Sequence, residues 1–185
     1  TAGIEGVTMR KIASAVGISA PAIYRHFKNK DDVLAALVIE GRRIFASYLF
    51  QALEAPTPKK RLWLTGKLYL DFGFENPEYY RVFFMAWDRL DPDKHGQRSP
   101  EETSPPPAFQ FLLDRIQECL RSGDLAPDTN IMEVALLCWG QCHGLTNLYL
   151  TGGVRHQMTL EQYRALCDGV LRRLFEGLFG TTLDE

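Results

Sequence analysis

Basic side chains are concentrated in one short segment near the N-terminus. Residues 7–30 contain no Asp or Glu and five basic residues, Arg10, Lys11, Arg25, Lys28 and Lys30. Guanidinium and ammonium groups donate hydrogen bonds to phosphate oxygens, and Arg also reads guanine through two parallel hydrogen bonds. A compact surface of one charge sign is typical of a domain that binds the major groove of DNA.

The charge of the chain is unevenly distributed. Residues 1–30 hold five Lys or Arg against Glu5 alone, a net charge of +4, whereas residues 31–185 hold 16 basic and 22 acidic residues, a net charge of −6. A basic N-terminal part on an acidic body indicates that only the N-terminal part meets a polyanion. The hydrophobic content of 45% predicts a folded chain with a real core.

Four cysteines and the absence of a long apolar run bear on the compartment. The chain has no C-x-x-C pair, and no stretch reaches 18 apolar residues. A 185-residue chain with a good core has little need of disulfides, so we expect reduced thiols, a cytoplasmic location and no membrane span.

A second group of reactive residue types occurs in L-C-W-G-Q-C-H-G-L, residues 137–145. The pattern G-x-C-x-G is found at the nucleophile elbow of α/β hydrolases, where Cys142 would be a cysteine nucleophile. An elbow requires a strand before it, and residues 131–139 are helical in pattern. Cys138 and Cys142 share a helix face, but His143 points about 100° away from Cys142, which disfavours a metal site. We therefore expect core cysteines, no enzyme activity, no metal and no cofactor.

Aromatic residues are abundant in the middle of the chain. Trp139 and His143 are four residues apart and share a helix face. Aromatic interiors line small-molecule cavities, although the same residues can simply fill a core. No inward cluster of Lys or Arg indicates an anionic ligand, so the predicted ligand is small and largely apolar. The predicted pocket residues are Phe72, Phe83, Trp87, Phe109, Trp139 and His143.

The elements that position the basic residues are two short helices and a tight turn. Thr8 is placed to cap a helix over residues 9–16, and Gly17 to end it in a left-handed conformation. Ser19 is placed to cap the second helix, and Pro21 is tolerated in its first turn. The predicted inward residues of this helix–turn–helix unit are Ile12, Ala13, Val16, Ile18, Ile23 and Phe27.

The rest of the chain also has helical periodicity and no sustained strand alternation. The predicted helices cover 31–52, 58–74, a segment that begins at Asn76-Pro77, 105–122 and 127–150, and a last helix that follows the capping box of Thr159 and Gln162. The polar residues 88–105 are predicted to form a loop. The fold class is therefore all-α, with an N-terminal helix–turn–helix domain over 1–50 and a larger helical domain over 51–185. A further helix is expected upstream of Gly3, because two short helices alone cannot bury enough surface.

The N-terminal motifs resemble those of one family. The pattern T-M-R-K-I-A-x-x-x-G-I-S-x-x-x-I-Y-R-H-F-K-N-K-D-D-V-L, within residues 6–37, resembles the DNA-binding domain of TetR-family transcriptional regulators. Residues 76–84 and 137–145 resemble the C-terminal domain of the family branch with a W-H-G motif. The resemblance implies a sequence-specific DNA-binding transcription regulator, most simply a repressor that a small ligand releases from its operator. A helical adaptor that binds no DNA remains an alternative.

The resemblance also implies roles for single residues. The residues implied at base edges are Arg10, Ala20, Pro21, Ala22 and Arg25. Those implied at phosphates are Thr8, Tyr24, His26 and Lys30, and Lys11 is grouped with the DNA-binding residues. Ala and Pro offer no polar side chain, so direct readout depends on the two arginines, with DNA shape supplying the rest. The last two helices of such proteins form a homodimer, which implies Leu166, Val170 and Leu174 as interface residues.

Overall fold

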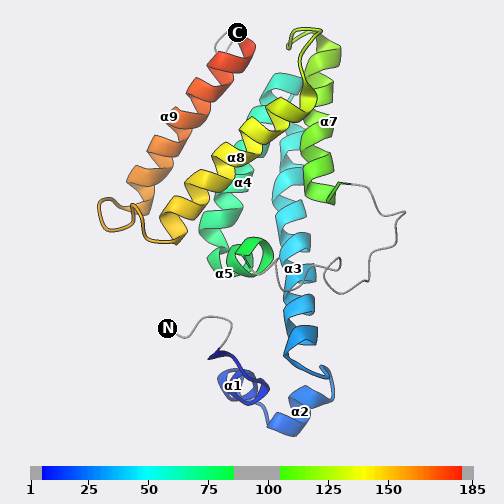
Figure 1. Cartoon of the computed structure of the whole chain (residues 1–185), viewed down its shortest axis with the longest axis vertical. Helices are drawn as coiled ribbons and strands as arrows, with labels where there is room; N and C mark the ends of the chain where they lie inside the picture. The colour runs from blue at the N-terminus through cyan, green and yellow to red at the C-terminus, as the bar shows by residue number, and fades with distance from the viewer. Residues whose placement is uncertain (1–5, 86–104, 181–185) are drawn as a thin grey trace. The chain divides into compact units, whose positions relative to one another are not determined.

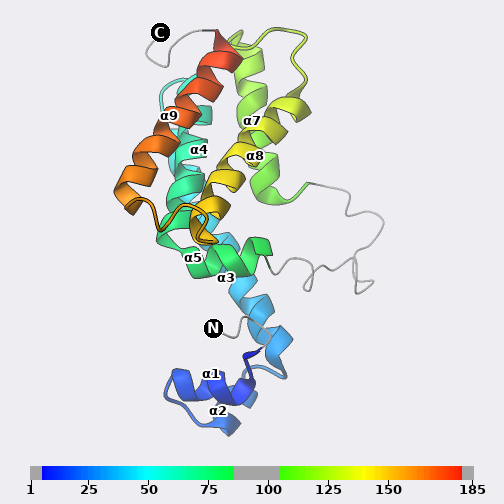
Figure 2. The same cartoon turned by 60° about the vertical axis from the view of Figure 1, so that its left-hand side comes forward.

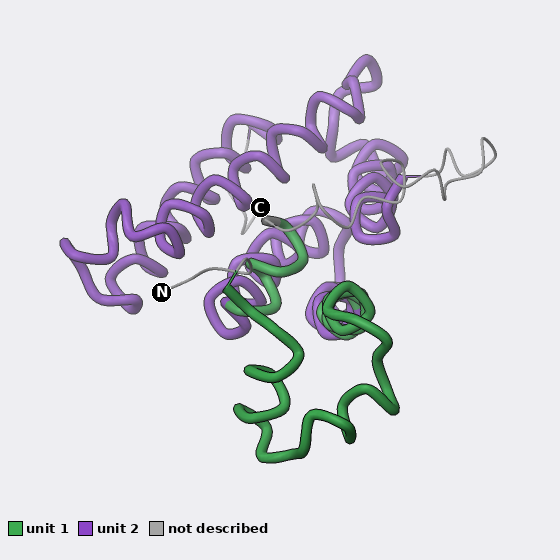
Figure 3. Tube along the Cα trace, turned by 60° about the horizontal axis from the view of Figure 1, so that its bottom comes forward, with its two compact units in different colours: residues 1–42, 78–101 green, residues 43–77, 102–185 purple. Residues whose placement is uncertain are grey.

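The computed structural model describes residues 6–85 and 105–180 of the 185-residue chain, and Figure 1 shows the order of the helices. The described residues form helices and turns without any strand, which confirms the all-α prediction. They divide into two compact units, shown in Figure 3. Unit 1 contains residues 6–42 and 78–85, and unit 2 contains residues 43–77 and 105–180. The division into folding domains at residue 50 stays a prediction.

Unit 1 begins with the predicted pair of short helices. Helix α1 covers Met9–Ala15, and its N-cap Thr8 accepts a hydrogen bond from the Lys11 backbone N–H at 3.3 Å. Gly17 has a φ of +73°, the left-handed conformation in which a side chain is strained, and it turns the chain toward α2 (Ala20–Tyr24). Ser19 occupies the N-cap of α2 but makes no side-chain capping bond. The two short helices and their turn are therefore set by local signals.

The core of unit 1 differs in part from the prediction. Ala13 and Ile23 are buried as expected, and they pack with Met9 and Val33, while Ile12 and Phe27 pack at the edge. The prediction of burial is wrong for Val16 and Ile18, whose side chains are 62% and 43% exposed. Val16 is the C-cap of α1, where the backbone leaves the helical conformation, and the left-handed turn that follows carries both side chains away from the core.

Helix α3 covers Lys30–Phe50 and contributes to both units. Asn29 caps this helix, because its Oδ1 accepts a hydrogen bond from the Asp32 backbone N–H at 2.9 Å. The predicted extension to Ala52 is instead a 3₁₀ turn, η2, over Gln51–Glu54. The helix predicted from Pro77 is split into α5 (Pro77–Tyr80) and a π-helical turn η3 over Arg81–Met85. Residues 86–104, which include most of the predicted loop, lie outside the described part.

Unit 2 is built from the end of α3 and four long helices: α4 (Pro58–Glu75), α7 (Pro107–Ser122), α8 (Ile131–Leu150) and α9 (Leu160–Phe179). Thr57 caps α4, and Thr159 and Gln162 form the predicted capping box of α9. Helix α8 begins four residues later than predicted, because the Asn130 side chain accepts hydrogen bonds from the backbone of the first turn. Helix α7 begins at Pro107 rather than Pro105.

Helix α4 lies among the other three long helices of unit 2 (Figure 2) and contacts each of them. It brings Leu62 into a cluster with buried residues of α7, α8 and α9, among them Ile116, Cys138 and Phe175. Helix α4 passes α8 at Gly66, where an added Cβ would make an ordinary contact with the Cys142 sulfur at 3.5 Å. None of the helices in residues 6–85 and 105–180 combines the length and apolar character that a membrane span requires.

Candidate nucleic-acid interface, pocket and dimer face

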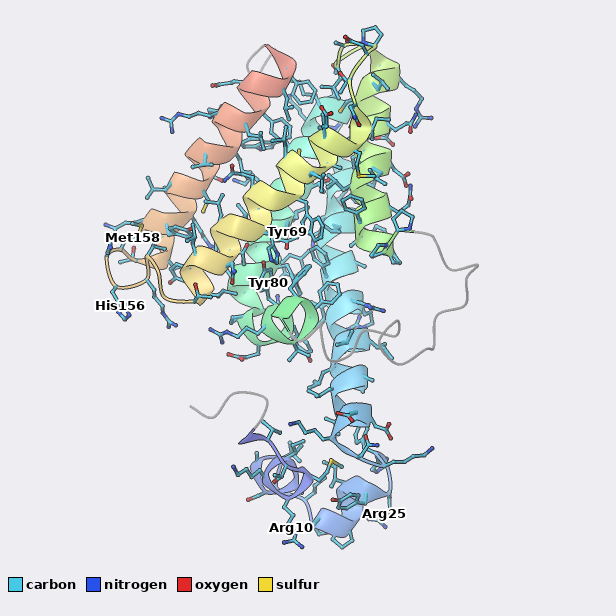
Figure 4. All side chains as sticks on the ribbon, viewed as in Figure 1. Arg10, Arg25, Tyr69, Tyr80, His156 and Met158 are labelled. Carbon is cyan, nitrogen blue, oxygen red and sulfur yellow. The ribbon has the colours of Figure 1, made fainter. Side chains whose placement is uncertain are left out.

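The basic residues of unit 1 lie on its surface. Arg10, Lys11 and Arg25 are exposed, and Lys30 is half-buried. Figure 4 shows Arg10, from α1, and Arg25, from the C-cap of α2, at the same end of unit 1. The two arginines that the sequence assigns to base edges are thus both exposed at the same end of unit 1 (Figure 4), although 15 positions separate them in the sequence.

Helix α2 has one buried anchor and an open outer side. Ile23 is 4% exposed, whereas Tyr24 is 53% exposed and is not part of the core. Pro21 is exposed, and the two alanines beside it are half-buried. These small side chains let the backbone of α2 approach a partner closely. The remaining predicted DNA-contact residues, Thr8 and His26, are also exposed.

Two local interactions shape this surface. The Lys11 Nζ donates a hydrogen bond to the Gly6 carbonyl at 2.7 Å, so its ammonium group holds the segment before α1. The carboxylate of Asp32 accepts a hydrogen bond from the Lys28 backbone N–H at 2.9 Å. Asp31 and Asp32 lie in the first turn of α3, where the helix dipole favours negative charge. Asp31 and Asp32 therefore follow directly after the acid-free basic segment, residues 7–30.

The predicted pocket residues fall into both units, and one cannot be placed. Phe83 is buried in unit 1, and Trp87 lies outside the described residues. In unit 2, the Trp139 ring lies 5.5 Å from that of Phe109 and 6.1 Å from that of His143. The structure therefore joins three of the predicted residues into one aromatic group, which extends from α7 to α8.

Tyr69 is a residue of this group that the sequence prediction missed. Its hydroxyl lies 2.9 Å from the His143 Nδ1, and its ring contacts that of Phe45 at 5.3 Å. Phe72, fully buried on α4, contacts Phe45 on its other side at 4.8 Å. The three-residue spacing of Tyr69 and Phe72 places both on one face of α4, which is the signal that could have found Tyr69.

Burial determines the charge state of His143. Desolvation lowers the pKa of its imidazole below the ordinary value, because the protonated form loses its hydration. The ring is therefore neutral at pH 7, and one of its nitrogens donates while the other accepts. A neutral imidazole beside a tyrosine hydroxyl offers hydrogen bonds to an uncharged polar group and no charge to attract an anion.

A separate hollow of about 180 Å³ lies between α4 and α9. None of the predicted pocket residues lines it. Its walls carry two ion pairs, one between Arg164 and Asp71 and one between Lys67 and Asp168 at 2.9 Å. The Cys167 side chain also lines it and is otherwise buried. Its charges are therefore already paired within the protein.

The apolar surface of α8 and α9 is larger than the sequence prediction assumed. On α9, Leu166 is 55% exposed, while Val170 is half-buried and Leu174 packs at the edge of the unit 2 core. Helix α8 adds five exposed apolar side chains and has no charged residue after Glu133. The absence of Asp, Glu, Lys and Arg from residues 134–150 is the sequence signal that could have indicated this surface. The five side chains are Met132, Leu136, Leu137, Trp139 and Leu148.

The enzyme and metal alternatives lack the geometry that they require. The G-x-C-x-G pattern lies in the middle of α8, and no strand precedes it in the described chain. Cys142 is buried, with its sulfur 3.7 Å from the Gly66 carbonyl, and desolvation raises the pKa of its thiol. A buried, protonated thiol is a poor nucleophile. Within the described ranges, no three potential ligands of His, Cys, Asp or Glu type gather around a metal position.

Comparison with known proteins agrees with this arrangement. The Nucleoid occlusion factor SlmA of Enterobacter sp. (strain 638) is 26% identical over 165 residues, which cover 85% of this chain and 79% of that protein. A tetR-family regulatory protein from Rhodococcus RHA1 has a similar fold, with a TM-score of 0.71 and 20% identity over 95% of this chain and 88% of its own. The transcriptional regulator FadR from Bacillus subtilis, solved in complex with stearoyl-CoA, has a TM-score of 0.71 and 17% identity over 95% and 91% of the two chains.

Two family models match the sequence itself. Residues 1–37 match the model of bacterial regulatory proteins of the tetR family. Residues 64–174, more than half of the chain, match the model of the tetracyclin repressor-like C-terminal domain. The two matches follow one another along the chain in the order that the helix–turn–helix unit and the long helices require. The chain therefore belongs to the TetR family of bacterial regulatory proteins.

Proposed function

We propose that this TetR-family regulator acts in the cytoplasm as a homodimeric repressor, which binds a DNA operator and leaves it when a small, largely apolar ligand binds. The observation that most supports it is the exposure of Arg10, Lys11 and Arg25 on the helix pair that the acid-free segment 7–30 forms. The proposal assigns no catalytic activity to the chain.

The DNA contacts divide by chemistry. Arg10 and Arg25 are proposed to read base edges, because a guanidinium forms two parallel hydrogen bonds with guanine. The half-buried alanines of α2 offer only apolar contact, to which a thymine methyl group is suited. Thr8, Tyr24, His26 and Lys30 are proposed to hold phosphates, which fix the register of α2 without reading sequence.

The test of DNA binding begins with selection from a randomised duplex library, because the operator sequence is unknown. Against the selected duplex, Arg25→Ala is expected to cost about 1–3 kcal/mol of binding free energy and to relax sequence preference. Lys30→Ala is expected to weaken all duplexes alike and to lower the salt slope by about 0.9, the contribution of one phosphate.

Arg155→Ala is the matched control, because Arg155 is an exposed basic residue in the loop between α8 and α9. It is expected to leave the affinity for the selected duplex unchanged. Equal effects of Arg25→Ala and Arg155→Ala would contradict a DNA surface on α2. So would a wild-type protein that selects no duplex at all, which would favour the helical adaptor.

A homodimer supplies the second DNA contact that a specific operator requires. One half-site contact is too weak to find an operator among genomic sites, and two-fold symmetry places two α2 helices about 34–36 Å apart. The exposed apolar side chains of α8, together with Leu166 on α9, support a dimer face on these two helices. The proposal retains Val170 and Leu174 of α9 in this interface.

The ligand is proposed to bind at the aromatic residues of unit 2, beside the hydrogen-bonded pair of Tyr69 and His143. The stearoyl chain of the stearoyl-CoA bound by FadR of Bacillus subtilis suits an aromatic lining, whereas its anionic CoA part has no basic partner among the residues of this aromatic group. A thermal-shift screen with long-chain acyl-CoA and a panel of apolar metabolites tests this proposal. His143→Phe is expected to abolish the shift. A compound that binds tightly but leaves operator affinity unchanged would refute the coupling, since linkage is reciprocal.

A further inference from the structure

Polar side chains connect α9 to α3 through the last turn of α4. Arg164, near the start of α9, forms ion pairs with Asp71 and with Glu75, whose Oε1 lies 3.0 Å from its Nη2. The other oxygen of Glu75 accepts a hydrogen bond from the Tyr48 hydroxyl at 2.7 Å. One carboxylate therefore joins a residue of α3 to a residue of α9.

The orientation of each group in this connection is fixed by its neighbours. The Asn76 Nδ2 donates a hydrogen bond to the Tyr48 oxygen at 3.1 Å, so the tyrosine proton is directed to Glu75. The Tyr48 ring packs edge-on against Phe72, with ring centroids 5.8 Å apart. On the other side, the Arg164 guanidinium lies 5.4 Å from the centroid of the Phe74 ring.

The location of the two carboxylates explains why Arg164 is needed. Asp71 and Glu75 lie in the last turns of α4, which have no basic residue of their own in the final turn. The carboxyl end of a helix dipole disfavours negative charge, so a cation from another element stabilises these acids. Arg164 supplies that cation from α9, and its removal leaves both carboxylates at an unfavourable helix end.

A second ion pair between the same helices gives an internal comparison. Lys67 on α4 lies 2.9 Å from Asp168 on α9. The side chains of Lys67 and Arg164 have nearly equal exposed fractions, 34% and 33%. Of these two cations, only Arg164 pairs with the carboxylate that Tyr48 contacts.

We propose that Arg164, Glu75 and Tyr48 form a positioning link that holds the C-terminal end of α3 in the operator-binding arrangement. The inference rests on the proposed function. Helix α3 runs without interruption from Lys30, a proposed phosphate contact, to Phe50. A hydrogen-bonded helix transmits a displacement of one end to the other. Since α9 also belongs to the proposed dimer face, the link couples dimer geometry to the DNA-contacting helices.

The test compares variants that differ in whether they break the link. Tyr48→Phe removes only the hydroxyl and keeps the ring contact with Phe72. Tyr48→Phe and Arg164→Gln are each expected to lower the affinity for the selected duplex about two- to thirtyfold, the range found for mutations that modulate coupling between sites. Because both act through Glu75, the double variant is expected to be no weaker than the weaker-binding single variant.

Lys67→Gln is the matched control and is expected to leave operator affinity within the error of the titration. Affinities are measured on the folded, active fraction of the full chain, and unfolding midpoints are recorded in parallel. A merely structural role would lower the midpoints of Arg164→Gln and Lys67→Gln alike without a selective loss of DNA affinity. The proposed link would be overturned by that result, by strictly additive losses of DNA affinity in the double variant, or by wild-type affinity of the Tyr48→Phe variant. A wild-type protein that binds no duplex would instead overturn the proposed function.

Discussion

Gly140 allows the proposed dimer face on α8 to be tested with a single methyl group. It is exposed near the middle of α8, and a Cβ built on it would meet no atom within 4 Å in the same protomer. Leu136, Gly144 and Leu148 lie on the same stripe at intervals of four residues, and the two leucines are more than half exposed. Gly140 and Gly144, which have no side chains, separate the two leucines, and this position is called the notch.

Two effects of Gly140→Ala have opposite consequences for the protomer and for the dimer. In the protomer, alanine is favoured over glycine in a helix interior by about 0.8–1 kcal/mol, and the methyl group enters open space. In a dimer packed over the notch, the methyl group overfills the contact at a cost of about 1–3 kcal/mol. The dimer dissociation constant is then expected to rise roughly 5- to 150-fold.

Sedimentation equilibrium measures the dissociation constant, and thermal unfolding over a wide range of protein concentration measures stability. Gly66→Ala is the matched control, since Gly66 also lies within a helix, and its added Cβ would make ordinary contacts at 3.5 Å with Cys142 and 3.8 Å with Leu171. It is expected to stabilise the protein without changing dimerisation. If Gly140→Ala behaves like Gly66→Ala in both measurements, the notch on α8 is not an interface.

Three further predictions concern the core of unit 2. Burial lowers the pKa of His143, so the unfolded chain binds more protons below about pH 6.5, and the free energy of unfolding falls there with a slope of at most about 1.4 kcal/mol per pH unit. In urea titrations at several pH values, His143→Gln should remove this slope, and His156→Gln in the exposed loop should retain it. Tyr163→Phe should cost about 1 kcal/mol in the same assay, because its buried hydroxyl donates to the Leu145 carbonyl at 2.8 Å. Leu171→Ala should cost about 2–5 kcal/mol, since Leu171 is 1% exposed, and a near-neutral result would contradict the packing around α9.

Helix boundaries were predictable where a side chain bonds to the nearby backbone. Thr8, Asn29 and Thr159 all accept hydrogen bonds from backbone N–H groups within three residues. Such signals depend on sequence spacing alone and need no tertiary contact. The start of α8 depends on the same kind of signal, because the helix begins after its N-cap Asn130 and not at Pro127.

Burial was harder to predict than helix position. Val16 and Ile18 fit the apolar spacing of α1 if that helix is continued. The helix ends at Ala15, however, so the spacing no longer predicts which side chains face the core. A periodicity rule holds only while the backbone stays regular. The predicted core omits Met9, which lies four residues before Ala13 on the same helix face and is buried like it.

The candidate sites show a similar division between local and tertiary information. The exposed basic surface followed from residue type and short spacing. The contact of Tyr69 with His143 joins residues 74 positions apart, and no pattern within either helix specifies it. The connection from Arg164 through Glu75 to Tyr48 requires three elements at once. Tertiary contacts of this kind depend on how helices pack, which spacing within one sequence segment does not determine.

Helix α8 presents apolar residues on two sides, and packing within unit 2 accounts for only one of them. Val134, Cys138 and Cys142 face the interior of unit 2 and are buried, whereas Leu136 and Leu148 are exposed. A helix that is apolar all round is stable in water only when other elements cover it. Unit 2 covers one side, and the proposed homodimer would cover the other side with a second copy of the same apolar surface.

The same helix also holds the aromatic group proposed to contact the ligand. Trp139 and His143 lie between the buried stripe and the exposed stripe of α8, on the side that faces Phe109 and Tyr69. A ligand that displaces these two side chains therefore acts on the helix that the proposed dimer shares. We expect ligand binding to change the dimer dissociation constant as well as operator affinity, because both depend on the position of α8. A ligand that releases DNA without any change in dimer stability would instead locate the coupling in α3 and α4 alone.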